Sequence, residues 1–169
     1  MDFVLSLAYN IVITFIRKIG HEFCMKITCL RLFRADMKTI KVVAAIICDS
    51  MNDKKRIFAT ARGYGDFKGK WEFPGGKIEK GETPQQALMR EIKEELETTI
   101  KVGDLIGTIE YDYPTFHLSM DCFWCEVIQG DLKLLEAEAA LWLTKDTLYS
   151  VPWLPADVTL IAEIEKQMS

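Results

Sequence analysis

The pattern of apolar and polar positions predicts a series of strands and two helices after residue 37. Residues 39–48 (TIKVVAAIIC) are β-branched and small apolar residues, the pattern of a buried strand. Further strand patterns cover residues 56–60, 71–74, 101–111, 116–127 and 141–143, and turn-forming residues separate most of them. The chain of 169 residues is long enough for one domain with a substantial core.

The two expected helices have recognisable starts and apolar faces. In the first, Thr83 is a good N-cap, Pro84 suits the first helical position and Gln86 completes a capping box. Its buried face is expected to hold the apolar residues at helical spacing, Leu88, Met89, Ile92 and Leu96. The second helix opens within residues 154–157, and the residues expected to pack on the sheet are Val158, Ile161 and Ile164.

The other face of the first helix is crowded with carboxylates. Glu91, Glu94 and Glu95 lie within an arc of about 100° on a helical wheel. Neighbouring pairs repel each other by about 0.2–0.5 kcal/mol, and a hard divalent cation with oxygen ligands would turn that repulsion into attraction. Glu82 lies at the helix start, close enough to join this face, and the glycines that permit tight turns before it are Gly75, Gly76 and Gly81.

The spacing of these residues is far more specific than an acidic helix alone, which would ordinarily be a solvated, salt-bridged surface. Read along the chain it is glycine, five residues, glutamate, seven residues, Arg-Glu-Ile, one residue and Glu-Glu, from Gly76 to Glu95. With this signature the sequence strongly resembles the Nudix hydrolases. The likeness extends over about residues 38–168. WEFPGGKIEKGETP and IEYDYP resemble the MutT-like branch with its 8-oxo-dGTP diphosphatases, and IKVVAAII, EAEAALW and PAD resemble bacterial CTP pyrophosphohydrolases.

The resemblance implies both a fold and an activity. The Nudix fold is an α/β fold in which a mixed β-sheet is sandwiched between α-helices. The branch reaction converts a nucleoside triphosphate and water into the monophosphate and pyrophosphate by attack on the β-phosphorus, with Mg²⁺ or Mn²⁺ as the cofactor. The expected substrates are CTP or dCTP-type nucleotides, or oxidised ones such as 8-oxo-dGTP. The alternatives are another substrate, such as ADP-ribose or a dinucleotide polyphosphate, and a non-catalytic nucleotide-sensing module.

The resemblance also assigns roles to the charged residues of the signature. Glu82 would support the metal cluster from the loop, and Arg90 would orient the carboxylates through its planar guanidinium. The backbone of Gly76 would approach the metal or a phosphate. Glu136 matches a further family glutamate, a metal ligand or proton acceptor, with Glu138 as its near rival. The metal ligands on the helix would be Glu91, Glu94 and Glu95.

Substrate contacts follow from the resemblance at three positions. Arg62 lies where the branch carries a phosphate-contacting arginine, although an ordinary surface arginine is an alternative. Phe73 and Asp157 occupy positions that contact the base in MutT-like enzymes. An ionised Asp157 can only accept hydrogen bonds, which suits an exocyclic amine such as that of cytosine or guanine. Asp157 as the N-cap of the last helix is the alternative.

One departure from the family pattern concerns the end of the acidic helix. The family usually has a glycine and then an apolar residue, where this chain has Glu97 and Thr98. Since that glycine normally ends the helix, we expect the helix to run further or to close differently.

Composition narrows the range of functions. The chain is 49% apolar and 27% charged with a net charge of −4, which does not indicate nucleic-acid binding through a basic surface. Five cysteines at irregular spacing do not suggest a disulfide framework, and Cys122 and Cys125 are expected to serve ordinary strand packing. The resemblance implies a cytoplasmic enzyme that works as a monomer or homodimer.

The first 36 residues differ from the rest of the chain. The apolar segment 3–16 is short for a membrane span, which needs about 20 residues, and no positive charge precedes it. Three interpretations stay open: an upstream extension outside the catalytic domain, from a misassigned start; a membrane-associated segment, which is not favoured; and an added helix packed on the domain. The expected division is therefore an extension at 1–36 and a hydrolase domain at 37–169.

Overall fold

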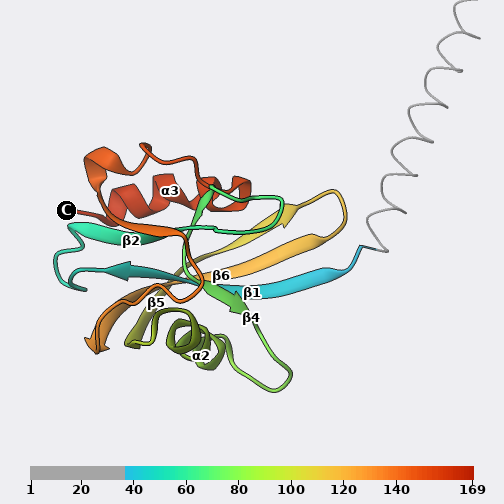
Figure 1. The fold of residues 1–169 in the computed structure, drawn as a ribbon, viewed down its shortest axis with the longest axis horizontal. Coiled ribbons are helices and arrows are strands. Elements are labelled where there is room, and N and C mark those ends of the chain that lie inside the picture. The colour runs from blue at the N-terminus through green and yellow to red at the C-terminus, as the bar shows by residue number, and fades with distance from the viewer. Residues whose placement is uncertain (1–36) are drawn as a thin grey trace, which may run out of the picture. The chain divides into compact units, whose positions relative to one another are not determined.

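The computed structural model describes residues 37–169, and Thr39–Ser169 form one compact unit (Figure 1). Predictions about residues 1–36, including membrane contact through residues 3–16, lie outside the described residues. Within residues 37–169, no helix is long and apolar enough to cross a membrane. The elements in chain order are β1 (Thr39–Cys48), β2 (Arg56–Ala61), β3 (Trp71–Glu72), β4 (Gly75–Lys77), α2 (Pro84–Leu96), β5 (Thr99–Asp112), β6 (His117–Gln129), β7 (Ala139–Thr144), the 3₁₀-helix η1 (Lys145–Thr147) and α3 (Pro155–Gln167).

The strands form one mixed sheet in the order β3-β2-β1-β6-β5, with β4 also paired to β1 and β7 to β2. The β1–β6 pair is parallel, from Thr39 beside His117 to Cys48 beside Glu126. The other strand pairs are antiparallel. The central position of β1 explains its nearly continuous apolar sequence, because a strand covered on both faces has no polar side.

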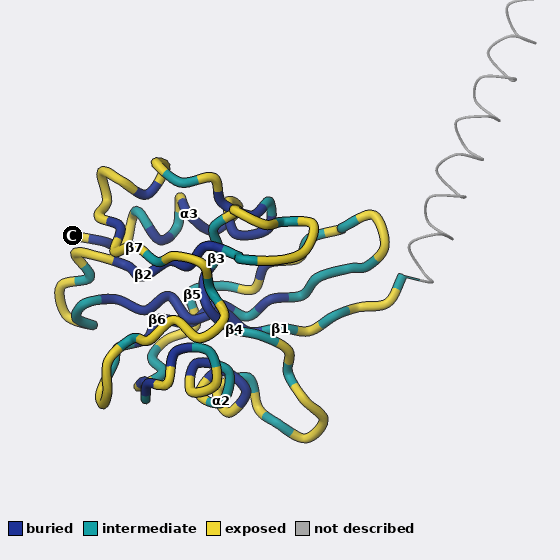
Figure 2. The backbone as a smooth tube through the Cα atoms, in the orientation of Figure 1, coloured by how far each residue is buried: buried dark blue, intermediate teal, exposed yellow. Residues whose placement is uncertain are grey.

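The two helices cover opposite faces of this sheet (Figure 1). Alternate side chains of β1 point to opposite faces, so each layer receives its own set. Val43, Ala45 and Ile47 pack in the cluster that contains the buried residues of α2. The intervening residues pack in the cluster of α3, and they are Ala44, Ile46 and Cys48. The buried central strands in Figure 2 lie between these layers, so the predicted α/β/α sandwich is confirmed.

Two apolar residues predicted to be buried on the helices are exposed. Met89 is 46% exposed, and Ala87 is buried next to Leu88 on that turn of α2. Ala87 and Met89 flank Leu88 on opposite sides, and a helical wheel does not reveal which flank meets the sheet. Val158 on α3 is 52% exposed for the same reason, since the stripe that packs on the sheet includes Leu160 instead.

The acidic helix closes in an unusual way. It ends at Leu96, so the expectation that it runs further is wrong. Glu97 itself adopts the left-handed conformation, with φ 54° and ψ 24°, and its N–H donates to the Lys93 carbonyl at 3.1 Å. Glycine is usual at such a position because a Cβ is strained there. Thr98 is fully buried, and its hydroxyl donates to the Gln129 carbonyl at 2.9 Å, which satisfies the polar group in an apolar setting.

The cysteines of β1 and β6 belong to the core. Cys48, Cys122 and Cys125 are free thiols, each at most 2% exposed. Burial raises the pKa of the Cys48 thiol to about 11, so this thiol stays protonated near neutral pH. The expected role of Cys122 and Cys125 in strand packing is confirmed.

Candidate active site

The glycine turn brings the backbone of β4 against both the sheet and the acidic helix. β4 pairs with β1, with Gly75 opposite Ala44 and Gly76 opposite Val43. A Cβ on Gly75 would lie 2.1 Å from the Val43 carbonyl oxygen, and a Cβ on Gly76 would lie 2.3 Å from Cδ of Glu91. Gly75 therefore requires glycine, because its neighbours are backbone atoms, whereas a Cβ at Gly76 would displace the Glu91 carboxylate that lies against the backbone of the turn.

Arg90 gathers three carboxylates of the signature around one guanidinium. Its Nε and Nη2 donate to the two oxygens of Glu82 at 2.8 and 2.9 Å, a bidentate pair. Nη1 donates to Glu91 at 2.9 Å and to Glu94 at 3.3 Å, and Nη2 also donates to the Lys77 carbonyl at 3.0 Å. The guanidinium holds the pKa of Glu82 down to about 2, so this carboxylate stays ionised across the physiological range.

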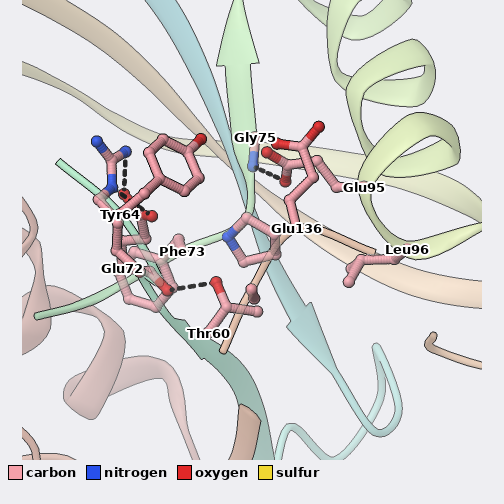
Figure 3. Close-up of a pocket in the computed structure, with 11 residues that line it drawn as sticks. Thr60, Tyr64, Glu72, Phe73, Gly75, Glu95, Leu96 and Glu136 are labelled. Atoms are coloured by element: carbon pink, nitrogen blue, oxygen red, sulfur yellow. Dashed lines mark hydrogen bonds and ion pairs between the residues drawn. The ribbon is translucent and has the colours of Figure 1, made fainter. Parts of the chain in front are cut away.

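Glu95 lies on the inner side of this group, next to the glycine turn. Its carboxylate accepts a hydrogen bond from the Gly75 N–H at 3.2 Å (Figure 3). Burial and the negative charges of Glu91, Glu72 and Glu136 together raise the pKa of Glu95 to about 7. A half-buried carboxylate close to other acids is an energetically costly arrangement, which a bound cation would relieve.

The donor set fits a hard divalent cation. Glu95 and its acidic neighbours offer carboxylate oxygens, which are the ligands that Mg²⁺ and Mn²⁺ prefer. Within residues 37–169, no three acidic, histidine or cysteine side chains already converge closely enough to hold a metal ion. Arg90 binds one oxygen of Glu91 and one oxygen of Glu94, and it makes no hydrogen bond to the second oxygen of either carboxylate.

One cleft unites nearly all the residues that the sequence singled out. Its walls come from β1, the loop after β2, β3, β4, α2, β6, the loop before β7 and the start of α3. Glu82 is not part of the wall and is joined to it by hydrogen bonds from Arg90 and from the Glu79 N–H. Glu136 lines the cleft, whereas its rival Glu138 packs beside Gly63. The predicted residues on the wall are Arg62, Phe73, Gly76, Arg90, Glu91, Glu94, Glu95, Glu136 and Asp157.

Phe73 and Asp157 also line the cleft, and they lie against each other. The Phe73 N–H donates to Oδ1 of Asp157 at 3.1 Å, and the Phe73 ring packs on Trp153 with centroids 4.7 Å apart. Asp157 is 3% exposed, and burial raises the pKa of its carboxyl to about 7. The interpretation of Asp157 as a helix N-cap is wrong, because the N-cap of α3 is Leu154.

Two residues of the cleft were not singled out from the sequence. Glu72, on β3, accepts two hydrogen bonds from Arg62, at 2.9 Å from Nε and 2.6 Å from Nη2. Tyr64 lies on the guanidinium of Arg62, with its ring centroid 5.8 Å from Cζ. A charged residue between two aromatic ones, Trp71-Glu72-Phe73, immediately before the glycine turn was the available signal for Glu72.

Comparison with known proteins agrees with this fold and cleft. The NUDIX domain family matches residues 40–164. The chain is 33% identical to the 8-oxo-dGTP diphosphatase of Escherichia coli over 77% of this chain and 99% of that protein. It is 34% identical to the CTP pyrophosphohydrolase of Escherichia coli over 74% of this chain and 90% of that protein. The solution structure of the E. coli ORF135 protein aligns with a TM-score of 0.66 and 31% identity, covering 78% of this chain and 92% of that one.

The chain therefore belongs to the Nudix hydrolases, enzymes that act on acid anhydrides. Members of this family generally use a divalent metal ion, which agrees with the donor set around Glu95. The identification of the MutT-like branch from the sequence is confirmed by these relatives.

Proposed function

We propose that this chain is a Mg²⁺-dependent pyrophosphohydrolase of nucleoside triphosphates that removes unwanted nucleotides from the cellular pool, with Mn²⁺ as a substitute metal. The observation that carries the proposal is the cleft itself. Its lining holds half-buried Glu95 among other carboxylates and also the Phe73–Asp157 pair. A triphosphate and a base attached to each other through a ribose need such a pair of subsites. The relatives named above, which hydrolyse nucleoside triphosphates by their names, support the same assignment.

The metal would be held by Glu91, Glu94 and Glu95 on the helix, with Glu136 and the backbone of Gly76 as further ligands. When bound, a divalent cation polarises the phosphate and lowers the pKa of the attacking water. Arg90 keeps the carboxylates in place through its fan of hydrogen bonds, and Glu82 in turn anchors Arg90.

The protein side chains then position a water for attack on the β-phosphorus. Glu136 and Glu95 are the candidates to receive its proton, because both line the same pocket beside Gly75 (Figure 3). The bond between the β-phosphorus and the bridging oxygen of the α-phosphate breaks, and pyrophosphate and the nucleoside monophosphate leave. Most of the rate gain in such a transfer comes from positioning and charge stabilisation.

The base would lie against Phe73 and Asp157. Because its pKa is about 7, Asp157 is available in its ionised form near and above neutral pH, and this form accepts a hydrogen bond from an exocyclic amine, as carried by cytosine and guanine. The ionised carboxylate has no proton to donate to a base that presents only acceptors there. Oδ1 already accepts from Phe73, so the other oxygen is the one available to the substrate. The proposed substrates are therefore CTP and dCTP-type nucleotides or oxidised guanine nucleotides such as 8-oxo-dGTP.

The hydrolase domain would consist of residues 37–169, with residues 1–36 as an extension that the reaction does not need. The match of the NUDIX domain to residues 40–164 supports this division. Deletion of residues 1–36 should leave kcat and KM unchanged. A soluble, folded but inactive truncation would show that the extension belongs to the working domain. We propose that the enzyme works in the cytoplasm as a monomer or homodimer.

A product assay tests the proposed reaction. The purified chain is incubated with Mg²⁺ and CTP, dCTP, 5-methyl-dCTP, dGTP, 8-oxo-dGTP or ADP-ribose, and pyrophosphate, phosphate and AMP are quantified. Pyrophosphate from one or a few triphosphates, lost when EDTA is added, is the expected result. AMP from ADP-ribose with no turnover of any triphosphate would overturn the substrate assignment while leaving the metal site standing.

A further inference from the structure

Arg62 and Glu72 form a cross-strand pair on the wall of the cleft. In the antiparallel β2–β3 pair, Thr60 lies opposite Glu72 and Ala61 opposite Trp71. Arg62 follows two residues after Thr60, on the same face, so its side chain reaches Glu72 diagonally across the ladder. The Arg62 N–H also donates to the Lys70 carbonyl at 2.9 Å, which extends the pairing beyond the strands.

The ion pair is close and bidentate. Nε and Nη2 of Arg62 donate to the two different oxygens of Glu72 at 2.9 and 2.6 Å, and the side chains are 34% and 21% exposed. This fork-to-fork geometry fixes the plane of a guanidinium more firmly than a single contact does. Tyr64 lies on the guanidinium at 5.8 Å and so limits its motion out of that plane.

The pairing leaves part of the guanidinium available. Two of its five N–H groups are used by Glu72, and within residues 37–169 Nη1 of Arg62 donates no hydrogen bond to another residue. Arg90, the other arginine on the wall, is occupied by three carboxylates and a carbonyl. Arg62 is therefore the arginine of the described cleft wall that has donors to spare for an anion.

Both oxygens of Glu72 are taken up by Arg62, which distinguishes it from the carboxylates of the acidic helix. Glu95 makes one hydrogen bond, to the Gly75 N–H, and keeps its other oxygen toward the cleft. A glutamate whose two oxygens are both held by an arginine is poorly placed to bind a metal, and well placed to orient the arginine.

We propose that Glu72 is a positioning residue that aims the free edge of Arg62 at the triphosphate of the substrate. This inference rests on the proposed function, because it requires an anionic phosphate chain in the cleft. Without Glu72, the long side chain of Arg62 would sample many rotamers, and substrate binding would have to restrict them again. Glu72 would then act on binding through Arg62 and make no contact with the substrate.

A double-mutant cycle in the full chain tests this coupling. Arg62→Ala should raise KM for the best triphosphate about tenfold or more, the effect of losing one charge-assisted hydrogen bond. Glu72→Ala should raise KM about fivefold to tenfold with kcat changed less than about threefold, because only the aim of Arg62 is lost. In an Arg62→Ala background, Glu72→Ala should have no further effect on KM. Glu72→Gln keeps an acceptor for the guanidinium and should recover most of the wild-type KM.

Binding measured without turnover supplies a second readout. The Kd of an α,β-methylene nucleoside triphosphate with Mg²⁺, measured by calorimetry, should follow the same cycle as KM. Asp49→Ala is the matched control, because Asp49 pairs with Arg56 at 3.5 Å at the far end of β2 and lies outside the cleft wall. That variant should leave KM and Kd unchanged.

The outcomes separate the inference from the proposed function. A normal KM in Glu72→Ala would overturn the positioning role. An equal increase in KM on Glu72→Ala with and without Arg62 would overturn it as well. An increase in KM in Glu72→Ala that a higher Mg²⁺ concentration reverses would also overturn the positioning role, since Glu72 would then be a metal ligand. If the wild-type chain turns over no triphosphate, the proposed function itself fails, and a normal wild type with normal Glu72 variants removes only this inference.

Discussion

The buried carboxyl of Asp157 makes a quantitative prediction about stability and pH. Asp157 is 3% exposed, and its pKa rises from 3.8 to about 7 because burial disfavours the charged form. In the folded chain the carboxyl keeps its proton up to about pH 7, whereas in the unfolded chain it loses the proton near pH 3.8. Since the folded state binds more protons, the free energy of unfolding falls as the pH rises from about 4 to about 7.

The size of the effect follows from the shift. Each pKa unit corresponds to about 1.36 kcal/mol, so a shift of about three units limits the total loss to about 4 kcal/mol. About 2.5 kcal/mol of it falls between pH 5 and pH 8. Asp157→Asn carries no titrating proton, and its amide oxygen can still accept from the Phe73 N–H. From pH 5 to pH 8, the free energy of unfolding of the variant should therefore rise by about 2.5 kcal/mol relative to that of the wild type.

Urea unfolding at pH 5 and pH 8, followed by tryptophan fluorescence, measures this difference. The wild type minus variant difference is the quantity of interest, because all other titrating groups contribute equally to both proteins. A difference that does not change between the two pH values would refute the buried, protonated carboxyl. A wild type that gains stability relative to Asp157→Asn as the pH rises would mean that an unseen partner favours the charged form.

Three further predictions concern the helix and the surface. Glu94→Gln should cut kcat by orders of magnitude with an unchanged melting temperature, because the Glu94 side chain is 60% exposed; normal hydrolysis would remove it from the metal site. Glu97→Gly should raise the melting temperature by about 2–4 °C, because glycine adopts the left-handed conformation of this position without strain. A lower melting temperature would mean that the ion pair between Glu97 and Lys133 stabilises the fold by more than the strain costs. His117 lies between Asp112 and Glu110, which raise its pKa. Its stabilisation should be full below pH 6.5 and lost as the pH rises through that raised value; an NMR titration midpoint at or below 6.5 would contradict this.

The parts of the site that are local in sequence could be predicted from the sequence. Arg90 reaches Glu91 and Glu94 within one turn of the helix, and the capping box of Thr83 fixes where that helix starts. Helix periodicity alone places these carboxylates on one side. The contact of the glycine turn with the helix is likewise local, because Gly76 lies against the carboxylate of Glu91 in the same motif.

The parts that depend on distant pairing could not be predicted in the same way. The hydrogen bond between Phe73 and Asp157 joins residues 84 positions apart, so the alternative of an N-cap was equally consistent with the sequence. The pair of Arg62 and Glu72 depends on the register of β2 against β3, which a two-residue strand does not reveal. The burial of Ala87 instead of a larger neighbour depends on how the helix lies on the sheet.

The central claim is that this cleft hydrolyses a nucleoside triphosphate by attack on the β-phosphorus. The most direct measurement is hydrolysis of CTP or dCTP with Mg²⁺ in ¹⁸O-labelled water, followed by mass spectrometry of the products. The account predicts one ¹⁸O atom in pyrophosphate and none in the nucleoside monophosphate. Label in the monophosphate would place the attack on the α-phosphorus, and release of inorganic phosphate with a nucleoside diphosphate would place it on the γ-phosphorus; either result would contradict the account.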